Sequence, residues 1–274
     1  MTQDQLSRLF NYGYDKRFSE AEAMGLDEMQ PIYERLIRRM IEEYGRTGQI
    51  NDNFIDQLSL EESLIFVYIG VGNRFKEWWA DLFSEISENP IPPSDTFNQV
   101  HMRQVARRRS ERLSESMRRT ARNRAASIID KIRAENPSEP LTRIADIVLE
   151  SDELKNSVDA MTMRTVRTEV NAAANESISH TAMGMNSPRN LMKRWETFGD
   201  ERVRPTHRAV GSMKPIPFEQ LFNVGGVQMR FPSDPQAFGR YVAGEVINCR
   251  CRMVVIPRGR TSRFFRGLRD FFGL

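Results

Sequence analysis

The chain has 274 residues, of which 39% are hydrophobic and 28% charged, and a formal net charge of +3. This composition is typical of a folded, water-soluble protein and argues against an intrinsically disordered one. The longest largely apolar run, Leu64 to Val71, is far shorter than the roughly 20 residues that span a bilayer. Met1 to Asn11 lacks the basic-then-apolar order of a signal peptide. We therefore expect the protein to be made in, and to stay in, a cytoplasm-like compartment.

Charge is distributed unevenly along the chain. Residues 1–100 carry 9 basic and 18 acidic side chains, 101–150 carry 12 and 7, 151–201 carry 6 and 8, and 202–274 carry 13 and 4. An acidic front and a basic rear indicate two kinds of partner, the second of them polyanionic. Arginine outnumbers lysine 34 to 6, which suits phosphate contacts but is equally the product of a GC-rich genome.

The first 90 residues are predicted to form an acidic helical region. One helix is expected to open near Pro31 and to close at Gly45. A second helix follows, and Gly70 and Gly72 are expected to interrupt it. We interpret the Trp78–Trp79 pair as core or subunit interface rather than as part of a ligand site.

The proline-rich stretch from 89 to 95 predicts a break, after which residues 91–185 are expected to form long basic helices. Thr96 and Gln99 have capping-box spacing for a helix that runs to about residue 135. One narrow apolar stripe, with residues spaced by four or three, is expected to pack along one seam: Leu113, Met117, Ala121, Ala125, Ile128 and Ile132. The first half of this helix carries nine arginines against two glutamates. Such a face is either a solvated one with i,i+4 ion pairs or a non-specific nucleic-acid contact. The candidate nucleic-acid-binding residues are Arg103, Arg107, Arg108, Arg109, Arg112, Arg118, Arg119, Arg122 and Arg124.

A short helix (141–149) and a long one (152–182) are predicted next. In the long helix Asn171 and Asn175 lie on one polar stripe with Arg164 and Arg167. Asparagine is a poor helix former, so this pair indicates a hydrogen-bonding role, with a plain solvent face as the alternative.

Beyond residue 190 the sequence changes character, and strands are predicted at 192–198, 227–231 and 253–256. The predicted fold class is therefore α+β: a mostly helical N-terminal part with long helices, followed by a small C-terminal α+β module and a basic tail. We place the module at 186–257 and the tail at 258–274.

Five short motifs follow one another in the second half of the chain. They are Arg167-Thr-Glu169, Trp195, Asp200-Glu-Arg202-Val-Arg204-Pro-Thr-His207, Pro232-Ser-Asp-Pro235 and Asn248-Cys249-Arg250-Cys251. This order closely resembles the phage Mu F-like head morphogenesis family, whose pattern runs Arg-Thr-Glu, Trp, Asp-x-Arg-x-Arg-x-x-His, Pro-x-Asp-Pro and Asn-Cys-Arg-Cys. The likeness covers about a third of the chain. It departs from the family at Ala209 to Ser212, where the family usually has an Asp-Gly pair.

The resemblance implies a minor structural protein of a tailed-phage head. Such proteins are present in few copies at the portal vertex and act in head morphogenesis, DNA packaging or genome delivery. The implied partners are the portal protein, other head proteins and packaged double-stranded DNA, and self-association is compatible with this role. The implied location is the virion, after synthesis in the bacterial host cytoplasm. No catalytic residue and no membrane partner are expected.

Three residues of the motifs are candidate metal ligands. His207, Cys249 and Cys251 offer soft or borderline donors, with Asp200 as the candidate for a fourth, and this set suits zinc. A disulfide between cysteines so close in sequence would be badly strained. The alternative is a hydrogen-bonded core in which the cysteines are small buried residues. In that arrangement Asp200 pairs with an arginine: Arg202, Arg204 or Arg250.

An enzymatic alternative uses part of the same set. Asp200, His207 and Asn248 could hold a metal-activated water near a phosphodiester, as in a metal-dependent nucleic-acid hydrolase. The sequence has no glycine-rich phosphate loop, no His-x-x-x-His pair and no clustered carboxylates, so we do not predict an enzyme. His101 and His180 are interpreted as surface or core filler.

The tail is basic and amphipathic. Its apolar residues fall on one helical face: Phe264, Phe265, Leu268, Phe271 and Phe272. Such a face lies on a membrane or docks into a protein groove, and we predict docking on a protein such as the portal. The Trp78–Trp79 region is a second candidate for an exposed apolar docking site.

Overall fold

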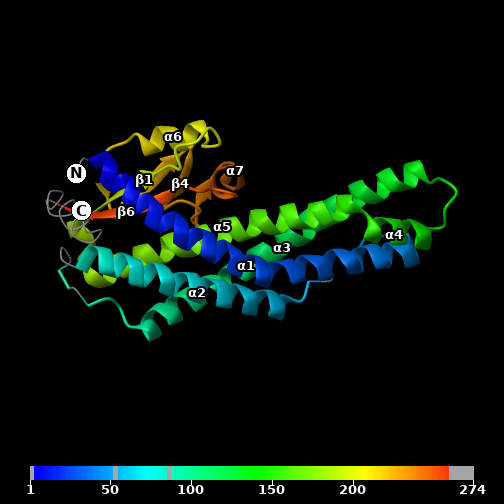
Figure 1. Cartoon of the computed structure of the whole chain (residues 1–274), viewed down its shortest axis with the longest axis horizontal. Helices are drawn as coiled ribbons and strands as arrows, with labels where there is room; N and C mark the ends of the chain where they lie inside the picture. The colour runs from blue at the N-terminus through cyan, green and yellow to red at the C-terminus, as the bar shows by residue number, and fades with distance from the viewer. Residues whose placement is uncertain (1–2, 52–54, 85–87, 90, 259–274) are drawn as a thin grey trace. The chain divides into compact units, whose positions relative to one another are not determined.

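The computed structural model describes residues 3–51, 55–84, 88–89 and 91–258 (Figure 1). Long helices come first and two small antiparallel sheets follow, so the predicted α+β fold class is confirmed. In the described residues no helix is both long enough and apolar enough to cross a membrane.

The helices and strands follow in a simple order. The helices are α1 (Gln3–Thr47), α2 (Gln57–Phe83), α3 (Asp95–Glu135), α4 (Leu141–Glu150), α5 (Asp152–Met185), the 3-10 turn η2 (Pro188–Asn190), α6 (Pro205–Gly211) and α7 (Val242–Val246). The strands are β1 (Leu191–Glu196), β2 (Ile216–Pro217), β3 (Phe222–Val224), β4 (Val227–Met229), β5 (Phe238–Gly239) and β6 (Arg252–Pro257). They form two antiparallel sheets, in the orders β2-β1-β6 and β3-β4-β5.

Contacts divide the chain into two compact units. The sheet-containing unit draws on residues 1–22, 67–104 and 167–274, and the helical unit on 23–66 and 105–166. Each of the four long helices α1, α2, α3 and α5 therefore contributes to both. The four sequence ranges proposed above follow the order of features along the chain, whereas the units follow packing between distant segments.

α1 does not begin near Pro31 as predicted. It begins at Gln3 and continues through Pro31 into the helical unit. A proline inside a helix loses one hydrogen bond to the carbonyl four residues earlier. Pro31 and Asp27 are both exposed, so water can solvate the carbonyl that is left without a partner. The helix ends where Gly48 takes φ +74 and its N–H bonds to the Tyr44 carbonyl, a left-handed C-terminal cap.

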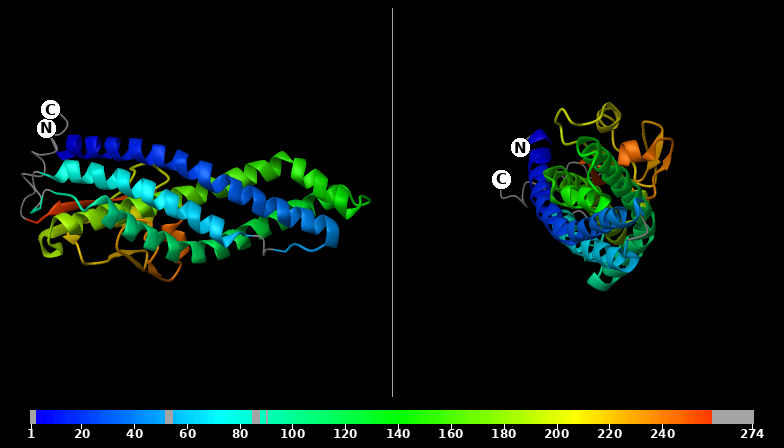
Figure 2. Two further views of the ribbon diagram at one scale, coloured as in Figure 1. Left: turned by 90° about the horizontal axis from the view of Figure 1, so that it is seen from below. Right: turned by 90° about the vertical axis from the view of Figure 1, so that its right-hand side faces the viewer.

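Side-chain contacts join the helices of this unit. The Tyr33 and Thr165 hydroxyls lie 2.8 Å apart between α1 and α5, and these two segments run side by side in Figures 1 and 2. A Cβ on Gly45 would lie 2.9 Å from Ala145 Cβ, so glycine is what permits α1 and α4 to approach closely. The predicted apolar stripe of α3 is buried as expected: Leu113, Met117, Ala121, Ala125, Ile128 and Ile132.

In the sheet-containing unit, α2 continues without interruption through Gly70 and Gly72, contrary to prediction. A Cβ on Gly72 would lie 2.8 Å from Met102 Cγ of α3. Its carbonyl accepts a hydrogen bond from the Ser177 hydroxyl of α5. Gly72 therefore serves close helix packing, which outweighs its poor helix propensity.

Trp78 and Trp79 belong to the core of this unit. Each is at most 2% exposed. Trp78 packs edge-on against Phe75 with ring centroids 6.0 Å apart, and Trp79 stacks on Phe83 at 4.4 Å. The core interpretation is confirmed. The suggestion that this pair forms an exposed docking site is wrong, because neither indole reaches the surface.

The two sheets supply the frame for the motif residues. β1 pairs with β6 over six residues, with Trp195 opposite Met253, and its alternate residues, including Leu191 and Trp195, are buried. The β3–β4 hairpin turns at two glycines with φ +59 and +87, the geometry of a two-residue type I′ turn. The three predicted strands are present as β1, β4 and β6, while β2, β3 and β5 were not predicted.

Candidate metal centre

The centre is formed by α6 and by the loop that leads from α7 into β6. Pro205 is the first residue of α6, where its missing N–H costs nothing, and the helix presents His207 inward, fully buried. Asn248 turns the loop with φ +57, a conformation that asparagine tolerates better than most residues. The two cysteines follow directly and are both buried.

The imidazole of His207 lies close to both thiols. Its Nδ1 is 3.3 Å from Cys251 Sγ and 3.5 Å from Cys249 Sγ. The ligand atoms of the three residues all lie within 4.8 Å of one another. Tetrahedral zinc with Zn–S of about 2.3 Å and Zn–N of about 2.0 Å holds sulfur and nitrogen about 3.5 Å apart. The spacing of these donors therefore fits one ion between them.

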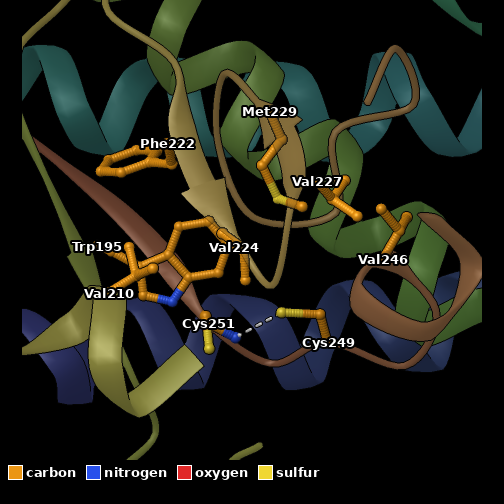
Figure 3. Close-up of a cluster of buried hydrophobic side chains, with 9 residues drawn as sticks. All are labelled: Trp195, Val210, Phe222, Val224, Val227, Met229, Val246, Cys249 and Cys251. Atoms are coloured by element: carbon orange, nitrogen blue, oxygen red, sulfur yellow. Dashed lines mark hydrogen bonds between the residues drawn. The ribbon is translucent and has the colours of Figure 1, made fainter. Parts of the chain in front are cut away.

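An apolar shell surrounds the thiols, as Figure 3 shows. The Trp195 ring stands edge-on to His207 with centroids 5.2 Å apart. The other apolar members of the cluster are Val210, Phe222, Val224, Val227, Met229 and Val246. Burial of this kind excludes water and strengthens electrostatic interactions inside the site.

The two thiols differ in acidity. The pKa of Cys251 is lowered to about 5 by the hydrogen bond from the Cys249 thiol and, against the effect of burial, by the neighbouring His207. Burial raises the pKa of Cys249. Cys251 is thus the more acidic of the two thiols, and the thiolate is the form that binds metal. A bound metal would deprotonate Cys249 as well.

A carboxylate that the sequence analysis missed lies on the other side of the ring. Glu245 Oε2 is 3.0 Å from His207 Nε2 and accepts a 2.9 Å hydrogen bond from the Thr206 hydroxyl. Glu245 belongs to none of the recognised motifs. The signal that could have identified Glu245 is its negative charge, because it is one of only four acidic residues in the basic segment 202–274.

Asp200 does not join the metal-ligand group found among the described residues. Both of its carboxylate oxygens lie 2.7 Å from Arg250 Nη2, and this hydrogen bond lowers the pKa of Asp200. The backbone N–H of Arg202 donates to the same carboxylate, whereas Arg204 donates to the Ile247 carbonyl. The alternative in which Asp200 pairs with an arginine is therefore confirmed for Arg250, and the candidate role of Asp200 as a fourth ligand is wrong.

Asn248 is also engaged elsewhere. Its Oδ1 accepts a hydrogen bond from Arg167 Nη1 at 3.2 Å, and its backbone N–H donates to the Thr168 hydroxyl at 2.8 Å. Arg167 in turn pairs with Glu22 at 2.7 Å. The trio considered for a hydrolase, Asp200, His207 and Asn248, therefore does not converge on one point.

The buried asparagines of α5 hold the cysteine loop in place. Asn171 Nδ2 lies 3.0 Å from the carbonyl oxygens of both Cys249 and Cys251. Asn175 Oδ1 accepts the N–H of Met253 at 2.7 Å. The hydrogen-bonding role predicted for the pair is confirmed. In the same helix, the third residue of the first motif, Glu169, accepts a hydrogen bond from the Tyr68 hydroxyl.

A second polar cluster was not predicted. Glu176, which is buried, lies 2.9 Å from His101 Nε2 and 3.0 Å from Arg230 Nη2. Arg230 also pairs with Asp234 at 2.7 Å. The His101 and His180 rings stack with centroids 3.9 Å apart. The two histidines, which we had interpreted as filler, are thus part of a charged network.

The predicted nucleic-acid-binding arginines lie on α3. Arg109 and Arg118 are half-buried and the other seven are exposed. Arg107 pairs with Glu61 at 3.0 Å, so part of this face takes part in ion pairs between helices. The predicted docking residues of the tail lie outside the described residues.

Comparison of the chain with protein-family models, curated proteins and solved structures found no match. The site is therefore interpreted from its own geometry.

Proposed function

We propose that the protein is a minor structural protein of a tailed-phage head, located at the portal vertex and acting in head morphogenesis, DNA packaging or genome delivery. The observation that carries the proposal is the mutual contact of motif residues that are far apart in the sequence. Arg167 bonds to Asn248, Asp200 to Arg250, and His207 to Cys251. Their polar atoms satisfy one another, as expected of residues that define a fold rather than bind a substrate.

This pattern supports a non-enzymatic protein over a nucleic-acid hydrolase. A metal-dependent hydrolase needs a solvent-accessible ligand position for the attacking water. His207 is fully buried and Cys251 is 3% exposed. Cleavage of DNA by the zinc-loaded protein would contradict the proposal.

Contact with packaged DNA is proposed for α3. Its exposed arginines belong largely to the helical unit, where they present positive charge. Such a surface binds duplex through phosphates and independently of sequence.

We further propose that His207, Cys249 and Cys251 bind one zinc ion. The donor types, their spacing and the low pKa of Cys251 support it. The ion would tie α6 to the start of β6 and contribute directly to folding. The purified protein should then carry about one equivalent of zinc, and Cys249→Ala should abolish it.

The head proposal is tested by purifying heads from infected or induced cells. The protein should be present in few copies and should co-purify with the portal ring. Its absence from purified heads would overturn the proposal, whatever the result for zinc.

A further inference from the structure

The carboxylate of Glu245 stands in a specific relation to the candidate zinc ligands. His207 faces the two thiols through Nδ1, while its Nε2 lies 3.0 Å from Glu245 Oε2. The two ring nitrogens point in different directions, so a carboxylate on Nε2 cannot also bind an ion on Nδ1. Glu245 is therefore outside the ligand set but in contact with it.

We propose that Glu245 is the positioning residue of the metal centre, an inference that rests on the proposed zinc site. By accepting the Nε2–H it selects the tautomer in which the Nδ1 lone pair faces Cys249 and Cys251. It also fixes the plane of the His207 ring. Histidines that bind metals commonly donate their other N–H to a carboxylate in this way.

The surroundings of Glu245 hold its carboxylate in this position. The Thr206 hydroxyl, one residue before the histidine, donates to Oε2 at 2.9 Å. A Cβ on Gly225 would lie 2.6 Å from Glu245 Oε1 and 3.0 Å from Thr206 Cγ2. Gly225 also takes φ +59. The glycine of the β3–β4 turn therefore serves two purposes, the turn itself and the space for the carboxylate.

The same chain of contacts, Cys251 to His207 to Glu245, has the order of a nucleophilic cysteine triad. A nucleophile must reach a substrate, and the imidazole that would activate it is fully buried. A second thiol, Cys249, lies 3.5 Å from the same nitrogen, which a triad does not need and a metal site does. The geometry therefore favours metal binding.

The test measures zinc affinity of the full-length reduced protein by competition with a chromophoric chelator. Glu245→Ala should weaken zinc binding about 10- to 100-fold, the usual cost of losing such a partner. Glu245→Gln should recover part of the loss, because its amide oxygen still accepts the Nε2–H without the charge. Glu219→Ala, at an exposed site in the same region, is the matched control and should bind as the wild type does.

Cobalt substitution separates positioning from ligation. The thiolate-to-cobalt charge-transfer bands of Glu245→Ala should match those of the wild type, because both sulfur ligands are retained, whereas Cys249→Ser should lose intensity. If Glu245→Ala does not fold, Thr206→Val removes only the hydroxyl that holds the carboxylate and should weaken zinc binding several-fold.

Three results would overturn the inference. Wild-type affinity in Glu245→Ala would remove the positioning role and leave the zinc proposal intact. Absence of zinc binding in the wild type would remove both. Rapid alkylation of Cys251 in the native metal-free protein, lost in Glu245→Ala, would assign the carboxylate to an activated thiol instead.

Discussion

At the scale of single residues, the geometry of the centre depends on hydrogen bonds from groups that touch no candidate ligand atom. Asn171 is the clearest case, because one buried amide serves two carbonyls of the cysteine loop. Its Oδ1 accepts the Tyr14 hydroxyl at 3.1 Å. Removing it would leave several buried groups without their partners.

We therefore expect Asn171→Ala to destabilise the protein by about 3 kcal/mol, since each buried polar group left unsatisfied costs about 1–3 kcal/mol. Urea unfolding measures the change. The exposed helical residue Asn123 provides the control, and Asn123→Ala should change stability by less than about 0.5 kcal/mol. Equal effects of the two substitutions would contradict the role assigned to Asn171.

The His101–His180 pair predicts sensitivity to acid. The pKa of His180 is lowered from 6.5 to about 4, by burial and by the charge of His101. Below pH 6.5 the unfolded chain thus binds a proton that the folded protein does not, so stability is complete above that pH and falls towards about pH 4. Burial acts to raise the pKa of Glu176, but hydrogen bonding to His101 and the charge of Arg230 lower it overall, which adds to the loss in acid.

His180→Asn should accordingly flatten the decline of the urea midpoint between about pH 6.5 and about pH 4. At neutral pH the urea midpoint of His180→Asn should differ from that of the wild type by much less than the wild-type midpoint falls between about pH 6.5 and about pH 4. A wild-type midpoint that is constant over this range would contradict the assignment.

At the scale of elements, the sequence correctly predicted the long helix whose apolar residues recur at a regular spacing. The stripe of α3 repeats over many turns, and both its helix and its buried face are found as expected. β2 and β5 have two residues each, too few for an alternating pattern to be recognised. Pro31 and Gly72 both have low helix propensity, and each was wrongly expected to end or interrupt a helix. At Pro31 water can solvate the carbonyl that loses its partner, and at Gly72 the absence of a side chain permits close helix packing.

The same distinction holds for the centre. His207, Cys249 and Cys251 were identified from their place in the motifs and from residue type, because few side chains bind soft metals. Glu245 was missed and Asp200 wrongly included, because which carboxylate reaches the imidazole depends on the fold. Here Asp200 forms an ion pair with the Arg250 guanidinium. Glu245 reaches the imidazole because Gly225 of the β3–β4 turn has no side chain that would clash with its carboxylate.

The basic face of α3 gives a prediction at this scale. Replacing Arg107, Arg108 and Arg109 by alanine should weaken non-specific duplex binding and reduce the salt slope by up to about three units, since each phosphate contact releases about one counterion. Binding is measured by fluorescence anisotropy over a range of salt concentrations. The triple replacement of Arg35, Arg38 and Arg39, exposed on α1, removes the same charge and is the control. Equal loss in both would indicate a general charge effect instead of a contact on α3.

At the scale of the whole molecule, both compact units are assembled from segments far apart in the chain. The motif region therefore cannot be cut out as residues 186–257 without losing α5, whose asparagines hold the cysteine loop. The C-terminal end is different. The N–H of Arg258 bonds to the Asn190 carbonyl at 2.7 Å, closing the β1–β6 pairing, and the predicted docking residues come only after it.

Truncation after Arg258 should consequently leave a folded protein, with a melting temperature within a few degrees of the wild type. If the apolar face of Phe264, Phe265, Leu268, Phe271 and Phe272 anchors the protein at the portal, the truncated protein should lose co-purification with the portal ring and incorporation into heads.

Aromatic anchors typically cost about 2 kcal/mol or more each when removed, so Phe264→Ala with Phe265→Ala should reduce portal binding by roughly three orders of magnitude. Replacing Arg260 and Arg263 by alanine keeps the apolar face and controls for the loss of positive charge. Normal incorporation of the truncated protein would exclude the tail as the anchor, and loss only in the arginine variant would indicate an electrostatic contact in its place.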